Sequence, residues 1–307
     1  MMDTDLGWWG IPLAMLAGAI RTSTPFLLVS LGECITEKSG RVNLGLEGIL
    51  VMGAMSAYAV AYLTGSPWLG VLAAAAIGAL FGTVHGLVCS LPRVNHIAVG
   101  IALMIFGTGL AFYLGKPYIQ PAAPRLPAVE LGNWSDIPQL RAALTVNSLF
   151  LIGVVLAPLL AWSFARSRWG LILRTVGDSR EAAEAAGISV NRVRTLATMA
   201  GGLLAGVGGS FLSLVYPGSW NEGLSSGQGL IAVALVIFAR WQPINCLYAA
   251  LLFGAAGALG PALQSVGVSS GYYLLNAAPY VLTLVVLVVA SSPRRLLAGA
   301  PGDLRIH

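Results

Sequence analysis

The stretch PWLGVLAAAAIGALFGTVHGLVCSL, from Pro67 to Leu91, runs for 25 residues without a single Asp, Glu, Lys or Arg. About 20 consecutive apolar residues are enough for an α-helix to cross the hydrocarbon core of a bilayer. The stretch therefore predicts a transmembrane helix. Gly78, Gly82 and Gly86 recur at every fourth position along it, a spacing that lets a second helix backbone approach closely in lipid. We expect this helix to pack inside a bundle.

The composition of the whole chain agrees with a membrane location. Of its 307 residues, 57% are hydrophobic and 9% are charged, and the mean hydropathy is +0.80. Soluble domains carry about 25% charged residues. The alternating segments of roughly 10 residues that are typical of membrane β-barrels are absent from the sequence. We therefore predict an all-α fold, a polytopic transmembrane helix bundle. The chain has three cysteines that lie far apart in the sequence, and this number and spacing indicate neither a disulfide framework nor a metal site.

Apolar stretches recur along the chain and predict about 8–10 membrane segments. Residues 8–20 fit either an interfacial helix or the first half of a tilted span. The segment 228–239 is too short to cross a bilayer, and the Gly- and Ser-rich stretch YPGSWNEGLSSGQG precedes it. We expect this part to re-enter the membrane from outside, because irregular backbone at membrane depth lines a cavity or is buried in protein. The predicted segments are 22–36, 48–64, 67–91, 94–115, 146–165, 195–216, 228–239, 244–263 and 272–290.

The distribution of basic residues predicts the orientation. If the loop 166–194 is cytoplasmic, 13 of the 17 Lys and Arg residues lie on that side, as expected for a membrane protein. This orientation predicts a cytoplasmic C-terminus, an external loop over residues 116–145 and one transmembrane domain over residues 1–307. The net charge of +5 then reflects membrane orientation, and we expect no nucleic-acid partner.

The stretch TVGDSREAAEAAGISVNRVR, from Thr175 to Arg194, is strongly charged. Asp178 or Ser179 can cap the N-terminus of a helix, and Gly187 can end it in the left-handed conformation. The pattern predicts a slim cytoplasmic helix of two to three turns. Such a helix either docks into a groove of another protein or simply joins two spans.

Several stretches between about residues 22 and 290 carry a resemblance to a known family. The stretch EAAEAAG, residues 181–187, resembles the EAA---G core of the coupling loop in permease subunits of ABC importers. The stretch TPFLLVSLGECITEKSGRVNLGLEGILVMGA, residues 24–54, resembles the branched-chain amino acid/ribose permease superfamily. Within it, the chain is most similar to nucleoside permeases that work with basic-membrane-lipoprotein-like binding proteins. The Ile-x-Leu-Pro sequence that usually follows the EAA core is missing.

The resemblance implies a permease subunit of a bacterial inner-membrane importer, with no catalytic residue. It implies a second permease subunit, cytoplasmic ATPase subunits and an external substrate-binding protein as partners, with lipid around the bundle. The sequence contains no G-x-x-x-x-G-K-[ST] motif, so we expect no cofactor on this chain and ATP with magnesium on the ATPase. The residues expected to couple to the ATPase are Arg180, Glu181, Ala182, Ala183 and Gly187.

The resemblance favours nucleosides as substrate. The alternatives are a simple-sugar or branched-chain amino acid importer and a secondary transporter that works without ATP. GLSSG, residues 223–227, also matches a hydrolase motif, but a helix break in the translocation path explains it better.

Polar and aromatic residues near the helix break are candidates for a substrate pathway. Aromatic rings can stack on nucleobases and amides can bond their edges. Ionisable residues at membrane depth usually face a cavity. Glu47 could instead be a cap that holds NLGLEG in shape, Glu222 could be solvated at the surface, and His85 could be a packing residue. The candidates are Asn43, Glu47, His85, Tyr216, Trp220, Asn221, Glu222 and Gln228.

Overall fold

The computed structural model describes residues 10–119, 121–135, 140–141, 144–264, 278, 281–282, 284–285 and 299–304. In this part of the chain, seven helices are long and apolar enough to cross a membrane. The predicted all-α, polytopic bundle is therefore confirmed. Most of the predicted segment 272–290 lies outside the described residues. The seven helices are α1 (Gly10–Lys38), α2 (Leu46–Thr64), α3 (Pro67–Val88), α4 (His96–Gly115), α6 (Ser148–Arg166), α9 (Val190–Leu214) and α11 (Pro243–Gln264).

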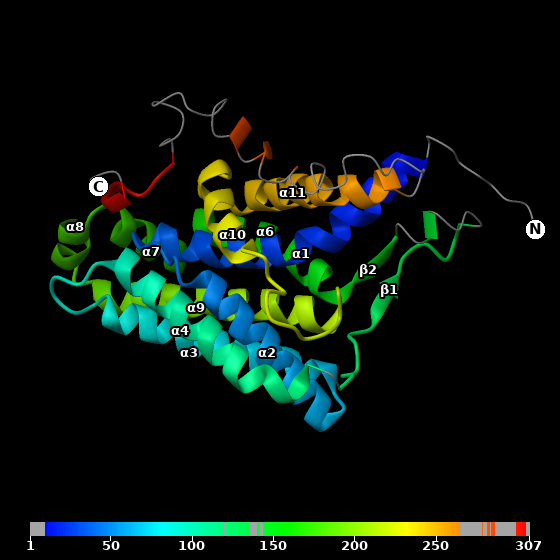
Figure 1. Cartoon of the computed structure of the whole chain (residues 1–307). Helices are drawn as coiled ribbons and strands as arrows, with labels where there is room; N and C mark the ends of the chain where they lie inside the picture. The colour runs from blue at the N-terminus through cyan, green and yellow to red at the C-terminus, as the bar shows by residue number, and fades with distance from the viewer. Residues whose placement is uncertain are drawn as a thin grey trace, which may run out of the picture.

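The bundle has two distinct ends (Figure 1). One end carries the short helices α7 (Arg168–Asp178) and α8 (Arg180–Ala185) together with the one-turn helix η3 (Gly302–Leu304). We call it the α8 end. The opposite end carries the strands β1 (Ala128–Glu130) and β2 (Thr145–Asn147), which pair antiparallel. We call it the strand end.

Helix α1 settles the two interpretations of residues 8–20. From Gly10 onward the chain is one continuous helix of 29 residues that ends at Lys38. Its length of about 44 Å exceeds the hydrocarbon core of about 30 Å. In the described part, this segment is therefore the first part of a long span and not a separate interfacial helix. A span of this length fits the membrane by tilting.

Helix α9 lies at the centre and packs against α1, α2 and α3. Small residues make this contact possible. A Cβ atom added to Gly53 of α2 would lie 2.6 Å from the carbonyl oxygen of Gly206 on α9. Gly78 and Gly82 of α3 likewise lie directly against the backbone of α9, next to Gly202 and Thr198. The predicted close packing of the glycine-rich helices is confirmed.

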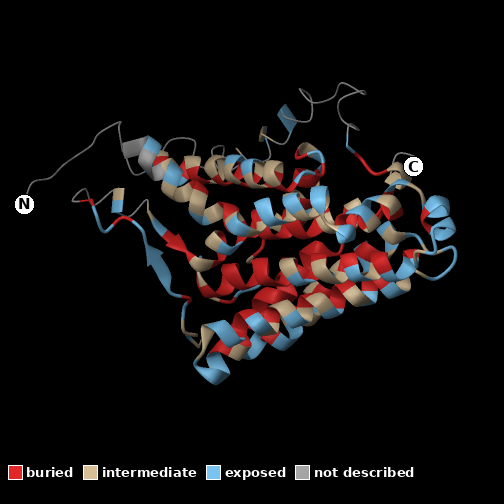
Figure 2. Cartoon of the chain, turned by 180° about the vertical axis from the view of Figure 1, so that it is seen from behind, coloured by how far each residue is buried: buried red, intermediate tan, exposed pale blue. Residues whose placement is uncertain are grey.

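Burial follows the same arrangement, with buried residues inside the bundle and exposed ones around it (Figure 2). Helix α2 is enclosed over most of its length, whereas only a small part of α4 is buried. The exposed residues of α4 include Ile105, Phe106 and Tyr113. A large exposed apolar surface on a soluble protein marks an interaction site. On this membrane protein it is the surface that meets lipid or another subunit.

The predicted external loop 116–145 forms the strand end. It contains η2 (Lys116–Tyr118) and β1, and it leads through β2 into α6. Asn147 caps α6, since its side-chain oxygen accepts a hydrogen bond of 2.7 Å from the amide of Phe150. The same side chain donates to Thr24 of α1 at 3.1 Å. These two bonds attach the strand end to the bundle.

Candidate functional site

The helical path is interrupted between α9 and α10 (Gln228–Phe238). α10 has 11 residues, a length of about 16 Å and so roughly half of the hydrocarbon thickness. The 13 residues between the two helices are not helical, and Gly227 adopts φ +80° directly before α10. This left-handed conformation is readily available only to glycine. The chain thus leaves α9 at the strand end and starts a new helix inside the bundle.

The carboxylate of Glu47 caps the start of α10. One oxygen accepts a hydrogen bond from the amide of Gly229 at 2.7 Å. The other accepts from the amide of Gly227 at 3.1 Å and from the hydroxyl of Ser225. Glu47 is buried. A buried charge is costly unless it is paired and hydrogen-bonded, and here the positive end of the helix dipole and three donors provide that compensation.

The contact lies about halfway along the bundle. A Cβ atom added to Gly48 would lie 2.6 Å from the carbonyl oxygen of Met104, which is in the middle of α4. Glu47 directly precedes Gly48 in the chain. The first turn of α10 therefore lies inside the bundle, about halfway between its two ends.

A short re-entrant segment, residues 39–45, positions Glu47. The chain turns back after α1 at Gly40, which has φ +85°. The amide of Asn43 then donates to Glu33 at 2.7 Å, and Glu33 lies more than one turn inside α1. The side-chain oxygen of Asn43 accepts from the amide of Gly45 at 2.9 Å. The segment SGRVNLGLEG thus folds back into the bundle before α2 begins.

A second buried acid of α1 fastens the other end of α10. Glu37 accepts a hydrogen bond from the indole of Trp241, which lies in the turn between α10 and α11. Both Glu33 and Glu37 are buried. Sequence reasoning missed these two acids, although they are ionisable residues spaced by four inside an apolar helix, and such residues are usually functional.

Several buried polar atoms of the candidate residues have no partner among the described residues. Besides one carboxylate oxygen each of Glu33 and Glu37, three of them belong to amide or indole groups. They are the side-chain nitrogen of Asn43, the side-chain oxygen of Gln228 and the indole nitrogen of Trp220. Leaving a buried donor or acceptor unpaired costs about 1–3 kcal/mol. One amide donor, one amide acceptor and one indole donor are therefore available for a polar ligand.

The structure brings some of the predicted pathway residues together and separates others. Glu47 and Gln228 lie at the start of α10. Asn43 lies four residues before Glu47 in the re-entrant segment, where its side chain accepts from Gly45. Trp220 is buried nearer the strand end, beside Gly115 and with its ring 6.5 Å from that of Phe112.

The other predicted pathway residues lie apart from this group. Tyr216 is exposed, and the guanidinium of Arg21 lies 5.6 Å from its ring centre. Asn221 and Glu222 are also exposed. His85 is buried near the α8 end of α3, where its ring lies 3.3 Å from the carbonyl oxygen of His96. Sequence reasoning read Ser225 as part of a helix break, but missed its bond to Glu47.

The predicted coupling residues form a small helix at the α8 end. Helix α8 has six residues, so the predicted two to three turns are too many. The hydroxyl of Ser179 caps it by accepting from the amide of Ala182 at 3.2 Å. Gly187 has φ +75°, and the amides of Gly187 and Ile188 bond the carbonyls of Glu184 and Ala183, both at 2.9 Å. This is the Schellman arrangement, which ends the helix where the sequence predicted.

The two faces of α8 differ. Ala183 is fully buried and packs with Leu173 and Val193. Glu181 and Ala182 are exposed, and Arg180 forms an ion pair of 2.8 Å with Glu184 along the helix surface. Ser189 precedes α9 but makes no capping bond with its side chain. α8 therefore presents a thin, charged outer face.

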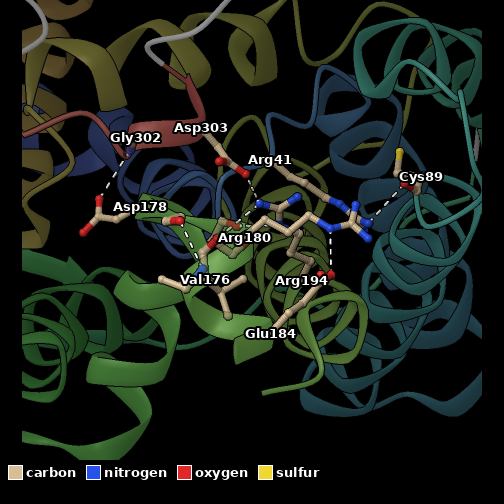
Figure 3. A network of polar contacts seen from close by, with 12 residues as sticks. Arg41, Cys89, Val176, Asp178, Arg180, Glu184, Arg194, Gly302 and Asp303 are labelled. Carbon is tan, nitrogen blue, oxygen red and sulfur yellow. Dashed lines mark hydrogen bonds and ion pairs between the residues drawn. The ribbon is translucent and has the colours of Figure 1, made fainter. Parts of the chain in front are cut away.

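Arg194 of α9 fastens this region to the bundle (Figure 3). Its guanidinium donates to the carbonyl of Ser39 at 2.9 Å and to that of Val176 at 3.2 Å, and it forms an ion pair with Asp303. α7, the re-entrant segment and the C-terminal residues thus meet at one side chain.

Comparisons with known proteins agree on a transport component. A family model described as "Branched-chain amino acid transport system / permease component" matches residues 15–291. The chain is 34% identical over 260 residues to a putative glucose ABC transporter permease of Haloferax volcanii, covering 83% of this chain and 79% of the relative.

Two further relatives have names that refer to nucleosides. The chain is 31% identical over 295 residues to the nucleoside ABC transporter permease protein NupC of Lactococcus lactis, covering 90% of this chain and 91% of the relative. It is 32% identical over 286 residues to the guanosine ABC transporter permease protein NupQ of Bacillus subtilis, covering 86% and 88%.

Proposed function

Because the chain belongs to the family of branched-chain amino acid transport system permease components, we propose that it is one of two membrane-spanning subunits of a bacterial ABC importer for nucleosides. The protein is a transport component and not an enzyme. The proposal concerns the solute, the partners and the way in which energy reaches the path.

The observation that carries the proposed substrate class is the Glu47 carboxylate at the start of α10. In transporters with interrupted helices, a half-helix N-terminus attracts the anionic group of the substrate. Here the amides of Gly227 and Gly229 already bond Glu47. A solute carboxylate would meet occupied donors and a like charge. The arrangement favours a neutral solute, such as a nucleoside or a sugar, over a branched-chain amino acid.

The polar atoms near α10 favour a nucleoside among neutral solutes. A nucleobase carries donors and acceptors on rigid edges and a flat face that stacks on aromatic rings. Asn43 and Gln228 offer one unpaired donor and one unpaired acceptor. The relatives of Lactococcus lactis and Bacillus subtilis are named for nucleosides and guanosine. A simple sugar is the second candidate, because the Haloferax volcanii relative is named for glucose.

The outer face of α8 supports the proposed coupling to a separate ATPase. Glu181 and Ala182 are exposed while Ala183 is buried, so a partner can cover the outer face without unfolding the region. We assign the α8 end to the cytoplasm and the protein to the inner membrane, since this places most basic residues inside. ATP and magnesium then bind the ATPase subunits.

A second permease and an external binding protein complete the proposed importer. Lactococcus lactis has two proteins named as nucleoside ABC transporter permeases, and this chain is similar to both. The exposed apolar faces of α4 and α11 offer surface for such a second subunit. The external binding protein delivers the solute at the strand end.

A short mechanical path joins α8 to the site. Movement of α7 and α8 reaches Ser39 through Arg194, which bonds both Val176 and Ser39. From Ser39 the re-entrant segment leads directly to Glu47 and so to the start of α10. We propose that closure of the ATPase pair shifts this path and exposes the site alternately to the two sides of the membrane.

The substrate is tested with the complete complex in proteoliposomes supplied with ATP. Uptake of labelled adenosine is measured against excess unlabelled guanosine, glucose or leucine. We expect guanosine to compete and leucine to have no effect. Competition by glucose without guanosine would favour the second candidate. Inhibition by leucine alone would overturn the neutral-solute proposal.

A further inference from the structure

A polar cavity of about 490 Å³ opens at the α8 end. Residues from separate parts of the chain line it: the re-entrant segment, the connection between α3 and α4, the start of α8, the start of α9 and the C-terminal segment. Its lining includes none of Asn43, Glu47 and Gln228. It is not part of the proposed substrate path.

The charge of the cavity is unbalanced. Four arginines line it, Arg41, Arg93, Arg180 and Arg194, and Asp303 is the one acid among the lining residues that the structure describes. Asp303 pairs with Arg194, and Arg180 pairs with Glu184 along α8. Arg41 and Arg93 have no acidic partner in the described part of the chain. The cavity therefore carries an excess of positive charge.

Arg41 shows how closely the cations are placed. Its guanidinium donates to the carbonyls of Gly86 at 2.7 Å and Cys89 at 3.1 Å and to the hydroxyl of Ser90 at 3.0 Å. All three acceptors are neutral, and Arg41 is 4% exposed. Burial lowers the pKa of Arg41 from its ordinary value to about 10, and the like charges of Arg194 and Arg180 lower it further. Holding a buried cation among other cations is unfavourable unless an anion compensates it.

We propose that this cavity binds a phosphate-bearing anion that bridges α8 to the re-entrant segment. Guanidinium groups present a planar fork of donors that matches phosphate oxygens. The volume falls within the range of roughly 300–1,000 Å³ found for small-molecule sites, so a phosphate with an attached group fits. The phosphate comes either from a soluble nucleotide or from the headgroup of an anionic phospholipid in the surrounding leaflet.

The location gives the bound anion a regulatory role. Arg180 opens α8, and Arg41 lies six residues before Glu47 in the chain. Both arginines line the cavity (Figure 3). An anion held by both fixes α8 relative to the segment that leads to the site. Binding restrains the movement on which coupling depends and so slows uptake. This effect on uptake rests on the proposed function, whereas binding itself does not.

Binding is measured on the complete complex in nanodiscs, with one arm for each source. In the first arm, discs of zwitterionic lipid are titrated with AMP and with inorganic phosphate at constant ionic strength. In the second arm, discs contain phosphatidylglycerol and no added phosphate, and the lipid retained by the complex is counted by native mass spectrometry. We expect saturable binding in one of the two arms.

The variant Arg93→Gln removes one cation from an exposed connection, and Arg192→Gln is its matched control. Arg192 is exposed near the start of α9 but does not line the cavity. We expect Arg93→Gln to weaken binding by roughly tenfold or more, the cost of one hydrogen bond to a charged group, with no change for Arg192→Gln. Arg180→Gln provides a second test should the first variant not assemble.

The outcomes separate the inference from the proposed function. Weaker AMP or phosphate binding in Arg93→Gln identifies a soluble ligand, and weaker lipid retention identifies the phospholipid. Absence of binding in both arms, or equal loss in Arg93→Gln and Arg192→Gln, overturns the site. If binding depends on Arg93 but does not change the rate of adenosine uptake, the site is confirmed and its regulatory role is wrong.

Discussion

Glu47 joins parts of the chain that are far apart in sequence. Its carboxylate bonds Gly227, which is 180 residues away. From the sequence, Glu47 is a candidate for either a pathway residue or a cap for its own segment. The structure shows that Glu47 is a cap, but it caps the start of α10 and not its own segment. Sequence patterns indicate which residues are buried, but they do not indicate which distant backbone group a buried carboxylate meets.

We expect Glu47→Gln to weaken both stability and uptake. An amide places an NH₂ group where the carboxylate accepts bonds, so at least one donor of α10 loses its partner, at a cost of about 1–3 kcal/mol. A lower melting temperature of the purified complex and slower ATP-driven uptake in proteoliposomes would show this. Glu222→Gln is the control, because Glu222 is exposed in the loop before α10. Normal uptake by Glu47→Gln would contradict the capping role.

Helices α2, α3 and α9 show what a sequence can reveal about packing. Gly78, Gly82 and Gly86 occur at every fourth position, which predicts a close contact with another helix. In the structure that helix is α9. The spacing does not name the partner helix, because several helices of this chain carry small residues. The end of α8 at Gly187 is predicted correctly because a local backbone conformation determines it. The contact of Glu37 with Trp241 is missed because it is not local.

The packing of α2 on α9 is tested with two alanine variants. A Cβ atom on Gly53 would lie 2.6 Å from a carbonyl oxygen of α9, whereas one on Gly109 of α4 would meet nothing within 4 Å. We expect Gly53→Ala to destabilise the protein by about 1–3 kcal/mol through overpacking. Gly109→Ala should leave the melting temperature unchanged or raise it slightly. Equal melting temperatures for both variants would show that α2 and α9 separate easily.

The two faces of α8 predict different effects for neighbouring residues. Ala182→Glu adds a charge to the exposed face, so the melting temperature should stay the same while ATPase stimulation and uptake are lost. Ala183→Glu buries an unpaired charge, so it should lower the melting temperature as well. Thermal melting and ATPase assays on the same preparations distinguish the two. If Ala182→Glu couples normally, α8 does not dock the ATPase.

At the scale of the molecule, the sequence predicts the class and most of the architecture. The family suggested by residues 24–54 and 181–187 is confirmed by the match over residues 15–291. The spans are predicted well because length and hydropathy decide them. The short α10 is predicted to re-enter because 12 apolar residues cannot cross a bilayer. The contacts that hold it could not be predicted, because they depend on the three-dimensional arrangement of α1, α2 and α11.

The chain depends on partner subunits for the energy of transport if the proposed function is correct. We expect the purified chain alone to catalyse no saturable uptake in liposomes. With the ATPase subunits, the second permease and the binding protein present, uptake should require ATP and continue when ionophores remove ion gradients. Labelled adenosine uptake with and without ATP and ionophores measures this. Gradient-driven uptake by the chain alone would identify a secondary transporter instead.

The bonds that residues 299–303 make at the α8 end also affect when this end becomes rigid during synthesis of the chain. Gly299 accepts a bond of 3.2 Å from Lys38, Gly302 donates to Asp178 at 3.3 Å, and Asp303 pairs with Arg194. A ribosome adds these residues only after every helix that they fasten. α7 and α8 are therefore synthesised before the residues that anchor them. If α8 docks the ATPase as proposed, its docking surface becomes rigid only after Asp303 has been added. On that proposal, chains that lack residues 299–303 compete poorly for the ATPase.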